Sequence, residues 1–262
     1  MNIDTLFDVT GKTVLITGGG SGIGTMATEA FVRAGCKVYI ASRRLESCEA
    51  VAEELNAVGP GQVIALQADL MTPEGTEVLA SQMAEHEDKL DILINNSGMT
   101  WGADFEDFPR SKWDDVLTLN VTAVADLTRL LLLMLRKAGT ADDPARIVNL
   151  GSVMGTKAVS NGAYSYAASK AAIHHFTRML ATELGSSHIT VNAIAPGPFP
   201  SRMMAFVTEN KKRRAAMEAY VPLHRFGKPE DIAGILLMLT SRAGSYITGG
   251  VIPLDGGMAA KP

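Results

Sequence analysis

Tyr166 and Lys170 stand four residues apart in the run Tyr-Ala-Ala-Ser-Lys, which pairs a phenol with an ammonium. On a helix, residues four apart share a face, so the two groups would point toward one place. A tyrosine pKa of about 10 is too high for efficient proton exchange at neutral pH, and a nearby ammonium lowers it. The pair therefore predicts a general acid/base centre, although the same spacing also arises by chance in surface pairs.

Polar residues also follow two apolar runs that we predict to be strands. Ser152 comes just after Arg146–Leu150, and Asn95-Asn96-Ser97-Gly98 closes a second run. Ligands of open α/β sheets bind beyond the carboxyl ends of the strands, so we expect Ser152 to orient and polarise a substrate oxygen there. Asn120 is a poor helix former inside the predicted helix Lys112–Lys137, which indicates a role at the site, a tolerated polar residue or a kink.

A glycine-rich segment, Gly18-Gly19-Gly20-Ser21-Gly22-Ile23-Gly24, follows the predicted strand Thr13–Thr17 and precedes a helix. Glycines allow a tight turn and a close approach of the backbone to a pyrophosphate at the helix N-terminus. The spacing differs from the Gly-x-Gly-x-x-Gly of the long-chain dehydrogenases. We interpret the segment as a dinucleotide-binding loop; the alternative is a glycine-rich turn without a ligand.

The second predicted strand, Lys37–Ala41, indicates which dinucleotide is bound. It ends in Ser42-Arg43-Arg44, without the carboxylate that binds the ribose hydroxyls in NAD enzymes. The guanidinium of Arg43 offers a planar fork of donors to a 2′-phosphate, with Ser42 and Arg44 as further candidates. We therefore expect NADP(H) rather than NAD(H); the alternative is that both arginines are solvated residues at a helix start.

Short apolar runs alternate with segments of helical length along the whole chain, which predicts βαβ crossovers and an α/β fold with a doubly wound parallel sheet. We expect one domain over residues 1–262, with about seven strands in a Rossmann arrangement and helices on both faces. The predicted strands are Thr13–Thr17, Lys37–Ala41, Val63–Ala68, Ile92–Asn95, Arg146–Leu150, Thr190–Ala195 and Val251–Pro253. The predicted helices include Gly22–Ala34, Leu45–Ala57, Lys112–Lys137 and Tyr166–Leu184.

The bulk composition excludes several classes of protein. A net charge of −4 gives no reason to expect a nucleic acid or an anionic membrane as partner, and 47% hydrophobic residues suffice for one large core. The longest apolar stretch, Leu130–Leu135, is far shorter than a bilayer span. Two cysteines build no disulfide framework, and no metal site or targeting signal is evident, so we expect a cytoplasmic protein.

Taken together, these motifs resemble the short-chain dehydrogenase/reductase family over essentially the whole chain, with Asp69-Leu70, Pro196-Gly197 and Asp255-Gly256-Gly257 adding to the match. The resemblance implies an oxidoreductase acting on CH–OH and C=O groups, with Tyr166 as general acid/base. It implies that Ser152 holds the substrate oxygen, that Lys170 binds the nicotinamide ribose and lowers the tyrosine pKa, and that Asn120 holds a water of a proton relay. The implied cofactor-binding residues are Gly18, Ser21, Gly22, Ile23, Gly24, Ser42, Arg43, Arg44, Asp69, Leu70, Asn96, Ser97, Gly98, Tyr166, Lys170, Pro196 and Gly197. It also implies a homotetramer in which Lys112–Lys137 and Tyr166–Leu184 pair between subunits.

Several stretches, among them Ser97–Ala103 and Asn192–Met203, are similar to the β-ketoacyl reductases of the rhamnolipid-biosynthesis type and related 3-oxoacyl-ACP reductases. That similarity implies an NADPH-dependent reductase of a 3-oxoacyl thioester or another apolar ketone. A segment near residues 198–226 is expected to cover the site with Phe199, Met203, Met204, Phe206, Met217 and Tyr220. These side chains would line an acyl pocket or pack the cover onto the body.

Other interpretations stay open. The main alternative is an NAD(P)⁺-dependent dehydrogenase of a sugar alcohol or another secondary alcohol, and a remote one is a dinucleotide-binding protein without turnover. The cluster Lys211-Lys212-Arg213-Arg214 would attract a carrier protein or coenzyme A phosphates, or form a solvated helix face. His174 and His175 are adjacent, so a helix points them about 100° apart and they do not suggest a metal pair.

Overall fold

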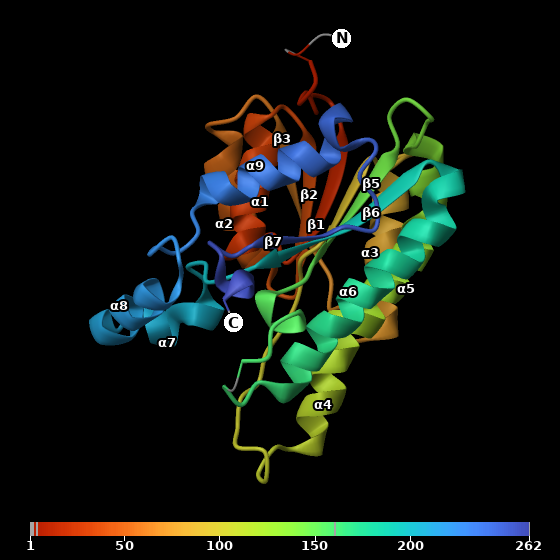
Figure 1. Ribbon diagram of the computed structural model, residues 1–262. Coiled ribbons are helices and arrows are strands. Elements are labelled where there is room, and N and C mark those ends of the chain that lie inside the picture. Colours follow the sequence, from red (N-terminus) through yellow and green to blue (C-terminus); the bar gives the residue numbers. More distant parts are fainter. Residues whose placement is uncertain (1–2, 4, 160, 262) are drawn as a thin grey trace.

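Seven parallel strands lie between two layers of helices in the computed structural model, which describes residues 3, 5–159 and 161–261 (Figure 1). The order in the sheet is β3-β2-β1-β4-β5-β6-β7. The strands are β1 (Thr13–Thr17), β2 (Lys37–Ser42), β3 (Gln62–Gln67), β4 (Ile92–Asn95), β5 (Ala145–Leu150), β6 (Ile189–Pro196) and β7 (Val251–Leu254). This confirms the predicted doubly wound Rossmann sheet, and each strand end falls within one residue of its predicted position.

Helices cover both faces of the sheet (Figure 1). One face carries α1 (Ile23–Arg33), α2 (Leu45–Asn56) and α9 (Pro229–Thr240), whose side chains share one core cluster. The other face carries α3 (Pro73–His86), α4 (Arg110–Leu117), α5 (Ala123–Ala138) and α6 (Tyr164–Leu184), and α3, α5 and α6 share the second cluster. All six residues of β5 are buried between these layers, and the strand is apolar except for Arg146 and Asn149, whose side chains are hydrogen-bonded.

The predicted helix Lys112–Lys137 is interrupted. A π-helical turn, Thr118–Thr122, separates α4 from α5, and Asn120 lies in that turn with 1% of its surface exposed. The sequence left a role at the site, a tolerated polar residue or a kink open for Asn120, and the structure shows a change of helix type there, with the Asn120 side chain hydrogen-bonded to Met99 and Ser169. Helix α6 begins at Tyr164 rather than Tyr166, so the tyrosine and the lysine both lie in its first two turns.

The continuous helical stretch Arg110–Ala138 is long and apolar enough to cross a membrane by length and composition. The sequence analysis considered only the uninterrupted apolar run Leu130–Leu135, which is too short to span a bilayer. The structure places this run in a longer helical stretch whose mean hydropathy is high enough to pass the test. The finding is weak evidence for a membrane, since core helices pass the same test, and Leu127 and Leu131 here pack against the sheet. A third of the most apolar window is buried, while Leu133 is 65% exposed, so the stretch also has an uncovered apolar side.

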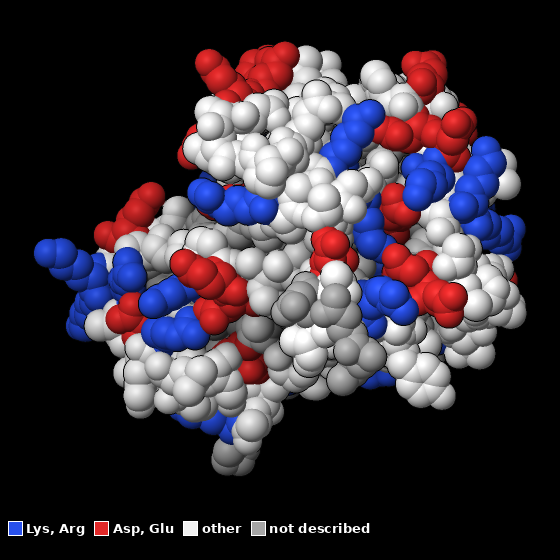
Figure 2. Space-filling model, turned by 90° about the horizontal axis from the view of Figure 1, so that it is seen from above, with Lys and Arg blue, Asp and Glu red and all other residues white. Residues whose placement is uncertain are grey.

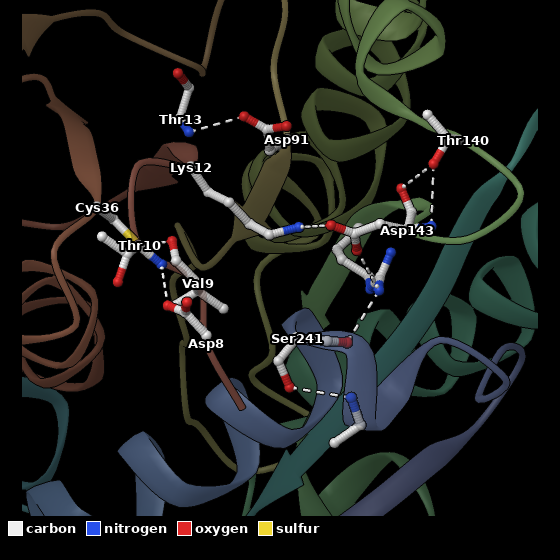
Figure 3. A network of polar contacts seen from close by, with 12 residues as sticks. Asp8, Val9, Thr10, Lys12, Thr13, Cys36, Asp91, Thr140, Asp143 and Ser241 are labelled. Atoms are coloured by element: carbon white, nitrogen blue, oxygen red, sulfur yellow. Dashed lines mark hydrogen bonds and ion pairs between the residues drawn. The ribbon is translucent and has the colours of Figure 1, made fainter. Parts of the chain in front are cut away.

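A polar network closes the amino edge of the sheet (Figure 3). Lys12 Nζ lies 2.6 Å from Asp143 Oδ2, and Arg146 Nη2 lies 3.0 Å from Asp143 Oδ1. The same guanidinium donates to the carbonyl of Ser241 over 2.9 Å. These contacts join the start of β1, the loop before β5 and the end of α9, at the edge opposite the carboxyl ends of the strands.

Candidate active site

One cavity of about 620 Å³ runs along the carboxyl ends of the strands, where the sheet order reverses between β1 and β4. Its size is that of a cofactor or ligand pocket, and its place is the usual one for open α/β sheets. Most of the predicted site residues line it, namely Gly18, Ser21, Gly22, Ile23, Ser42, Arg43, Arg44, Asp69, Leu70, Asn96, Ser97, Gly98, Ser152, Tyr166, Lys170, Pro196 and Gly197. Gly24 and Asn120 do not line the cavity. Gly24 packs against Gly18, and Asn120 is hydrogen-bonded to Met99.

The glycine loop has the geometry of an anion cradle. Gly18 and Gly22 adopt φ values of 69° and 57°, which favour glycine, and a Cβ on Gly24 would lie 2.1 Å from the Gly18 carbonyl oxygen. Helix α1 starts just after the loop without a side-chain cap and without an acidic residue in its first turn. The N-terminus of this helix thus meets the cavity lining at Gly22 and Ile23 with no carboxylate to repel an anion, so the segment fits a dinucleotide pyrophosphate.

Asn96 and Ser97 hold the loop against the sheet. Asn96 Nδ2 donates to the carbonyls of Thr17 over 2.8 Å and Gly18 over 3.2 Å, and the N–H of Ser97 donates to Thr17 Oγ1 over 3.0 Å. The amide that was predicted to line the cofactor thus also fixes the turn that would bind it.

The end of β2 places Arg43 at the rim of the cavity. Its side chain is 68% exposed, and Arg43 Nε lies 4.0 Å from Asp69 Oδ1. The hydroxyl of Ser42 donates to the carbonyl of Arg44 over 2.8 Å, so that hydroxyl is already engaged. Ser47, which the sequence analysis missed, also lines this part of the cavity. The free guanidinium fork of Arg43 is the strongest candidate partner for a 2′-phosphate.

Ser152, Tyr166 and Lys170 meet at the centre of the cavity. Ser152 lies two residues beyond the end of β5 at Leu150, and its hydroxyl forms a hydrogen bond with the Tyr166 phenol. Lys170 Nζ donates to the Leu150 carbonyl over 2.6 Å and lies 5.5 Å from the centre of the Tyr166 ring. The predicted convergence of phenol and ammonium on one face of a helix is confirmed.

The electrostatics of this centre differ from the expectation. Burial raises the pKa of Tyr166, and the hydrogen bond with Ser152 works in the opposite direction. Burial also lowers the pKa of Lys170 to about 8. The net lowering of the Tyr166 pKa that was expected from Lys170 is therefore not seen, because burial outweighs the opposing hydrogen bond with Ser152. The phenol is protonated at neutral pH, as a general acid must be.

Asn120 supports the site through its side chain. Asn120 Oδ1 accepts from the N–H of Met99 over 2.9 Å, while Nδ2 donates to the Met99 carbonyl over 3.0 Å and to Ser169 Oγ over 2.9 Å. Ser169 in turn donates to the Tyr166 carbonyl over 2.7 Å. Both amide atoms of Asn120 are thus engaged with groups of the protein, which ties the turn at Asn120 to the segment at Met99 and to helix α6.

Segment 198–226 contributes an apolar wall. After β6 the chain forms α7 (Ala205–Thr208) and α8 (Lys211–Tyr220), which project from the body beside the cavity (Figure 1). The predicted residues Phe199, Met203, Met204, Phe206 and Met217 line the cavity. Tyr220 does not, because its ring packs 4.7 Å from Lys261 Nζ on the outer side. Met258, unpredicted because it comes from the far end of the chain, lines the same wall.

Helix α8 begins with the predicted basic cluster Lys211–Arg214, at one end of the molecule (Figure 2). Arg213 donates to the Phe206 carbonyl over 3.2 Å, and Arg214 Nε lies 3.0 Å from Glu218 Oε1. Half of the cluster is thus engaged within its own segment, and its role stays a prediction.

The chain is similar to known proteins over nearly its full length. A sequence model of the family described as enoyl-(acyl carrier protein) reductase matches residues 18–259. The rhamnolipids biosynthesis 3-oxoacyl-[acyl-carrier-protein] reductase of Pseudomonas aeruginosa is 44% identical over 251 residues, covering 96% of this chain and 97% of that protein. The 3-oxoacyl-[acyl-carrier-protein] reductase FabG of Aquifex aeolicus is 35% identical, covering 95% and 97%.

Solved structures show the same likeness. The Pseudomonas aeruginosa RhlG/NADP active-site complex superposes with a TM-score of 0.94 at 43% identity, covering 99% of this chain and all of that one. A putative NAD(P)-dependent gluconate 5-dehydrogenase from Beutenbergia cavernae with bound NADP gives 0.90 at 34% identity, covering 98% and 100%. The second neighbour carries a name from carbohydrate metabolism, so fold alone does not select the substrate.

Proposed function

The chain belongs to the short-chain dehydrogenase/reductase family, and on that premise we propose that it is an NADPH-dependent reductase of 3-oxoacyl thioesters. The observation that carries the proposal is the Ser152–Tyr166–Lys170 centre, with Ser152 and Lys170 buried, in a cavity with a glycine cradle at one end and an apolar wall at the other. The relatives named as 3-oxoacyl-[acyl-carrier-protein] reductases support the substrate class.

Each residue of the centre has a separate role in the proposed carbonyl reduction. Ser152 donates a hydrogen bond to the substrate oxygen and orients it toward the Tyr166 phenol, which gives its proton to that oxygen. Bound NADPH supplies the hydride. Lys170 binds the nicotinamide ribose and keeps a positive charge close to the phenolate that proton transfer leaves. Asn120 holds a water of the relay through which the proton of Tyr166 is replaced.

The protonation state of the centre favours reduction at neutral pH. Because burial raises the pKa of Tyr166, the phenol carries the proton that a ketone must receive. Oxidation of an alcohol needs the phenolate instead, and this environment disfavours that form. Oxidation of an alcohol by the same centre should therefore gain in rate as the pH rises.

The apolar wall favours an acyl chain over a sugar. Three methionines, Met203, Met204 and Met217, line the cavity with Phe206, and such side chains adapt to a flexible aliphatic substrate. A sugar ketone would need convergent polar partners for its hydroxyls. This contrast separates the proposal from the sugar-alcohol alternative that the gluconate 5-dehydrogenase neighbour represents.

The test is a substrate panel followed by loss of NADPH absorbance. Acetoacetyl and longer 3-oxoacyl thioesters of coenzyme A and of a carrier protein are compared with simple ketones and ketoses, with NADPH and NADH. We expect fast NADPH oxidation with the thioesters, abolished in Tyr166→Phe. Turnover of ketoses alone would assign the chain to sugar metabolism. Cofactor binding without turnover of any carbonyl would assign it to the non-catalytic class.

We further propose that the protein is a cytoplasmic homotetramer built through α5 and α6. Both helices expose apolar side chains to solvent, with Leu133 at 65% and Met179 at 59% exposure. Covering them in a subunit interface removes apolar surface from water. Light scattering during size exclusion should give four times the chain mass, and Leu133→Glu should lower it. A monomeric mass at micromolar concentration would refute the assembly. Fractionation of the source cell tests the compartment.

A further inference from the structure

His174 lies directly beneath the turn that carries Ser152. The N–H of Ser152 donates to His174 Nε2 over 3.4 Å, and His174 Nδ1 lies 3.4 Å from Thr156 Oγ1. The ring is thus bonded to both ends of one turn, Gly151–Thr156. It belongs to helix α6, as do Tyr166 and Lys170, and it is 4% exposed.

The turn is shaped to receive this ring. A Cβ on Gly151 would lie 2.2 Å from His174 Nε2, and a Cβ on Gly155 would lie 2.7 Å from His174 Cε1. Both distances are shorter than any real contact, so the imidazole occupies the space that side chains at these two positions would need. This packing fixes the distance between the turn and helix α6, and it therefore also fixes the position of the Ser152 backbone.

The bonding pattern assigns the proton of the ring. Nε2 accepts from a backbone N–H and is therefore unprotonated, so the proton of the neutral ring sits on Nδ1 and donates toward Thr156. Burial and the nearby charges of Lys170 and Arg178 lower the pKa of His174 to about 4, against an opposing hydrogen bond with the Gly155 backbone. The ring stays neutral throughout any ordinary assay.

We propose that His174 is a positioning residue for the reduction: its neutral Nδ1–H ring anchors the Ser152 turn, so that the Ser152 hydroxyl faces the Tyr166 phenol. The inference rests on the proposed function, because it assigns a role in that reaction. Ser152 Oγ must meet both the substrate oxygen and the phenol. Replacing His174 with an apolar residue would leave the buried N–H of Ser152 without a hydrogen-bond partner and would allow the turn Gly151–Thr156 to shift.

The tautomer is tested without any substrate. Two-dimensional ¹H–¹⁵N spectra of the histidine side chains of the wild-type protein identify which nitrogen is protonated. We expect His174 as the neutral Nδ1–H form with Nε2 unprotonated. His175, its exposed neighbour, serves as the internal reference. An Nε2–H tautomer or a charged ring at neutral pH would overturn the proposal, whether or not the enzyme reduces thioesters.

Kinetics test the consequence. His174→Leu should lower kcat by about tenfold to a hundredfold, the scale of a small misplacement of a reacting group, with the KM for NADPH unchanged. His174→Gln, whose amide oxygen reaches as far as Nε2, should recover most of the loss. His175→Leu is the matched control and should keep wild-type kcat. In a Ser152→Ala background, His174→Leu should have little further effect, because the two residues act as one unit.

The outcomes separate this inference from the proposed function. Wild-type kcat in His174→Leu, or equal and additive losses in both backgrounds, would overturn the positioning role. Failure of the wild type on every thioester would overturn the proposed function and leave the tautomer measurement standing. If His174→Leu does not fold, His174→Gln and the wild-type spectra still decide.

Discussion

Replacing Arg43 with alanine should convert an enzyme that prefers NADPH into one that hardly discriminates between NADPH and NADH. A charge-assisted hydrogen bond to a phosphate contributes about 1.5–3 kcal/mol. Arg43 is 68% exposed and has the Asp69 carboxylate at 4.0 Å, so solvent and a competing partner place it in the lower half of that range. A loss of about 1.5–2 kcal/mol corresponds to a roughly tenfold to thirtyfold weaker binding of NADPH. NADH has no 2′-phosphate, so its affinity should not fall.

The assay compares Kd and kcat/KM for both dinucleotides under one ionic strength, because salt screens an exposed charge. Arg44→Ala, measured in the same way, shows which of the two arginines at the cavity rim contributes to binding of the 2′-phosphate. Arg33→Ala, which removes a charge from the end of α1 outside the cavity lining, controls for net charge. A similar loss for NADH and NADPH, or no loss for NADPH, would refute the assignment of Arg43 to the phosphate.

Three further changes probe the site. Tyr166→Phe should lower kcat by about 10²–10⁴-fold while the Kd for NADPH, measured by its fluorescence, stays constant. Because burial lowers the pKa of Lys170 to about 8, its charge is present below that pH and lost above it, so the pH profile of kcat for reduction should be level on the acid side and fall above about 8. A level profile on the alkaline side would contradict this role. Gly24→Ala should raise KM for both dinucleotides, since its Cβ would lie 2.1 Å from the Gly18 oxygen, whereas Gly185→Ala meets nothing within 4 Å and should change neither KM nor the melting temperature.

The strands and the main catalytic residues were predictable because their signals are local. Strands of a parallel sheet that is covered on both faces are mostly apolar, so short runs such as Thr13–Thr17 and Ile92–Asn95 are recognisable without their neighbours. The pair Tyr166 and Lys170 was predictable from helical spacing, and the glycine loop from the backbone freedom that a phosphate turn requires.

The features that sequence missed depend on partners far along the chain. The π turn at Asn120 follows from bonds to Met99 and Ser169, which lie 21 and 49 residues away. His174 and His175 are adjacent residues of the same type, so the sequence does not tell them apart. Only the tertiary structure shows that His174 packs under Ser152 while His175 is exposed. The direction of the Tyr166 pKa shift also needs the structure, because burial raises this pKa by more than the hydrogen bond with Ser152 lowers it.

The network at the amino edge gives a prediction that separates stability from function. Arg146 is fully buried, and within the described chain its Nε and Nη1 have no hydrogen-bond partner, so Asp143 and the Ser241 carbonyl alone compensate its charge (Figure 3). Asp143→Asn would leave that charge unpaired. Removing one partner of a buried ion pair costs about 3–5 kcal/mol, and because Asp143 is 37% exposed we expect about 2 kcal/mol.

Arg146→Met should behave oppositely. It removes the buried charge together with the two unpartnered donors, and an apolar residue of similar length fills the space. Such replacements are neutral or stabilising by about 1–4 kcal/mol, so the free energy of unfolding should not fall. Urea denaturation at fixed protein concentration measures both variants, and Lys12→Met controls for loss of the outer ion pair to Asp143. Because the network lies at the edge opposite the cavity, kcat should be unchanged in all three. If Arg146→Met were less stable than Asp143→Asn, the guanidinium would stabilise the fold in its own right, and the argument from its missing partners would be wrong.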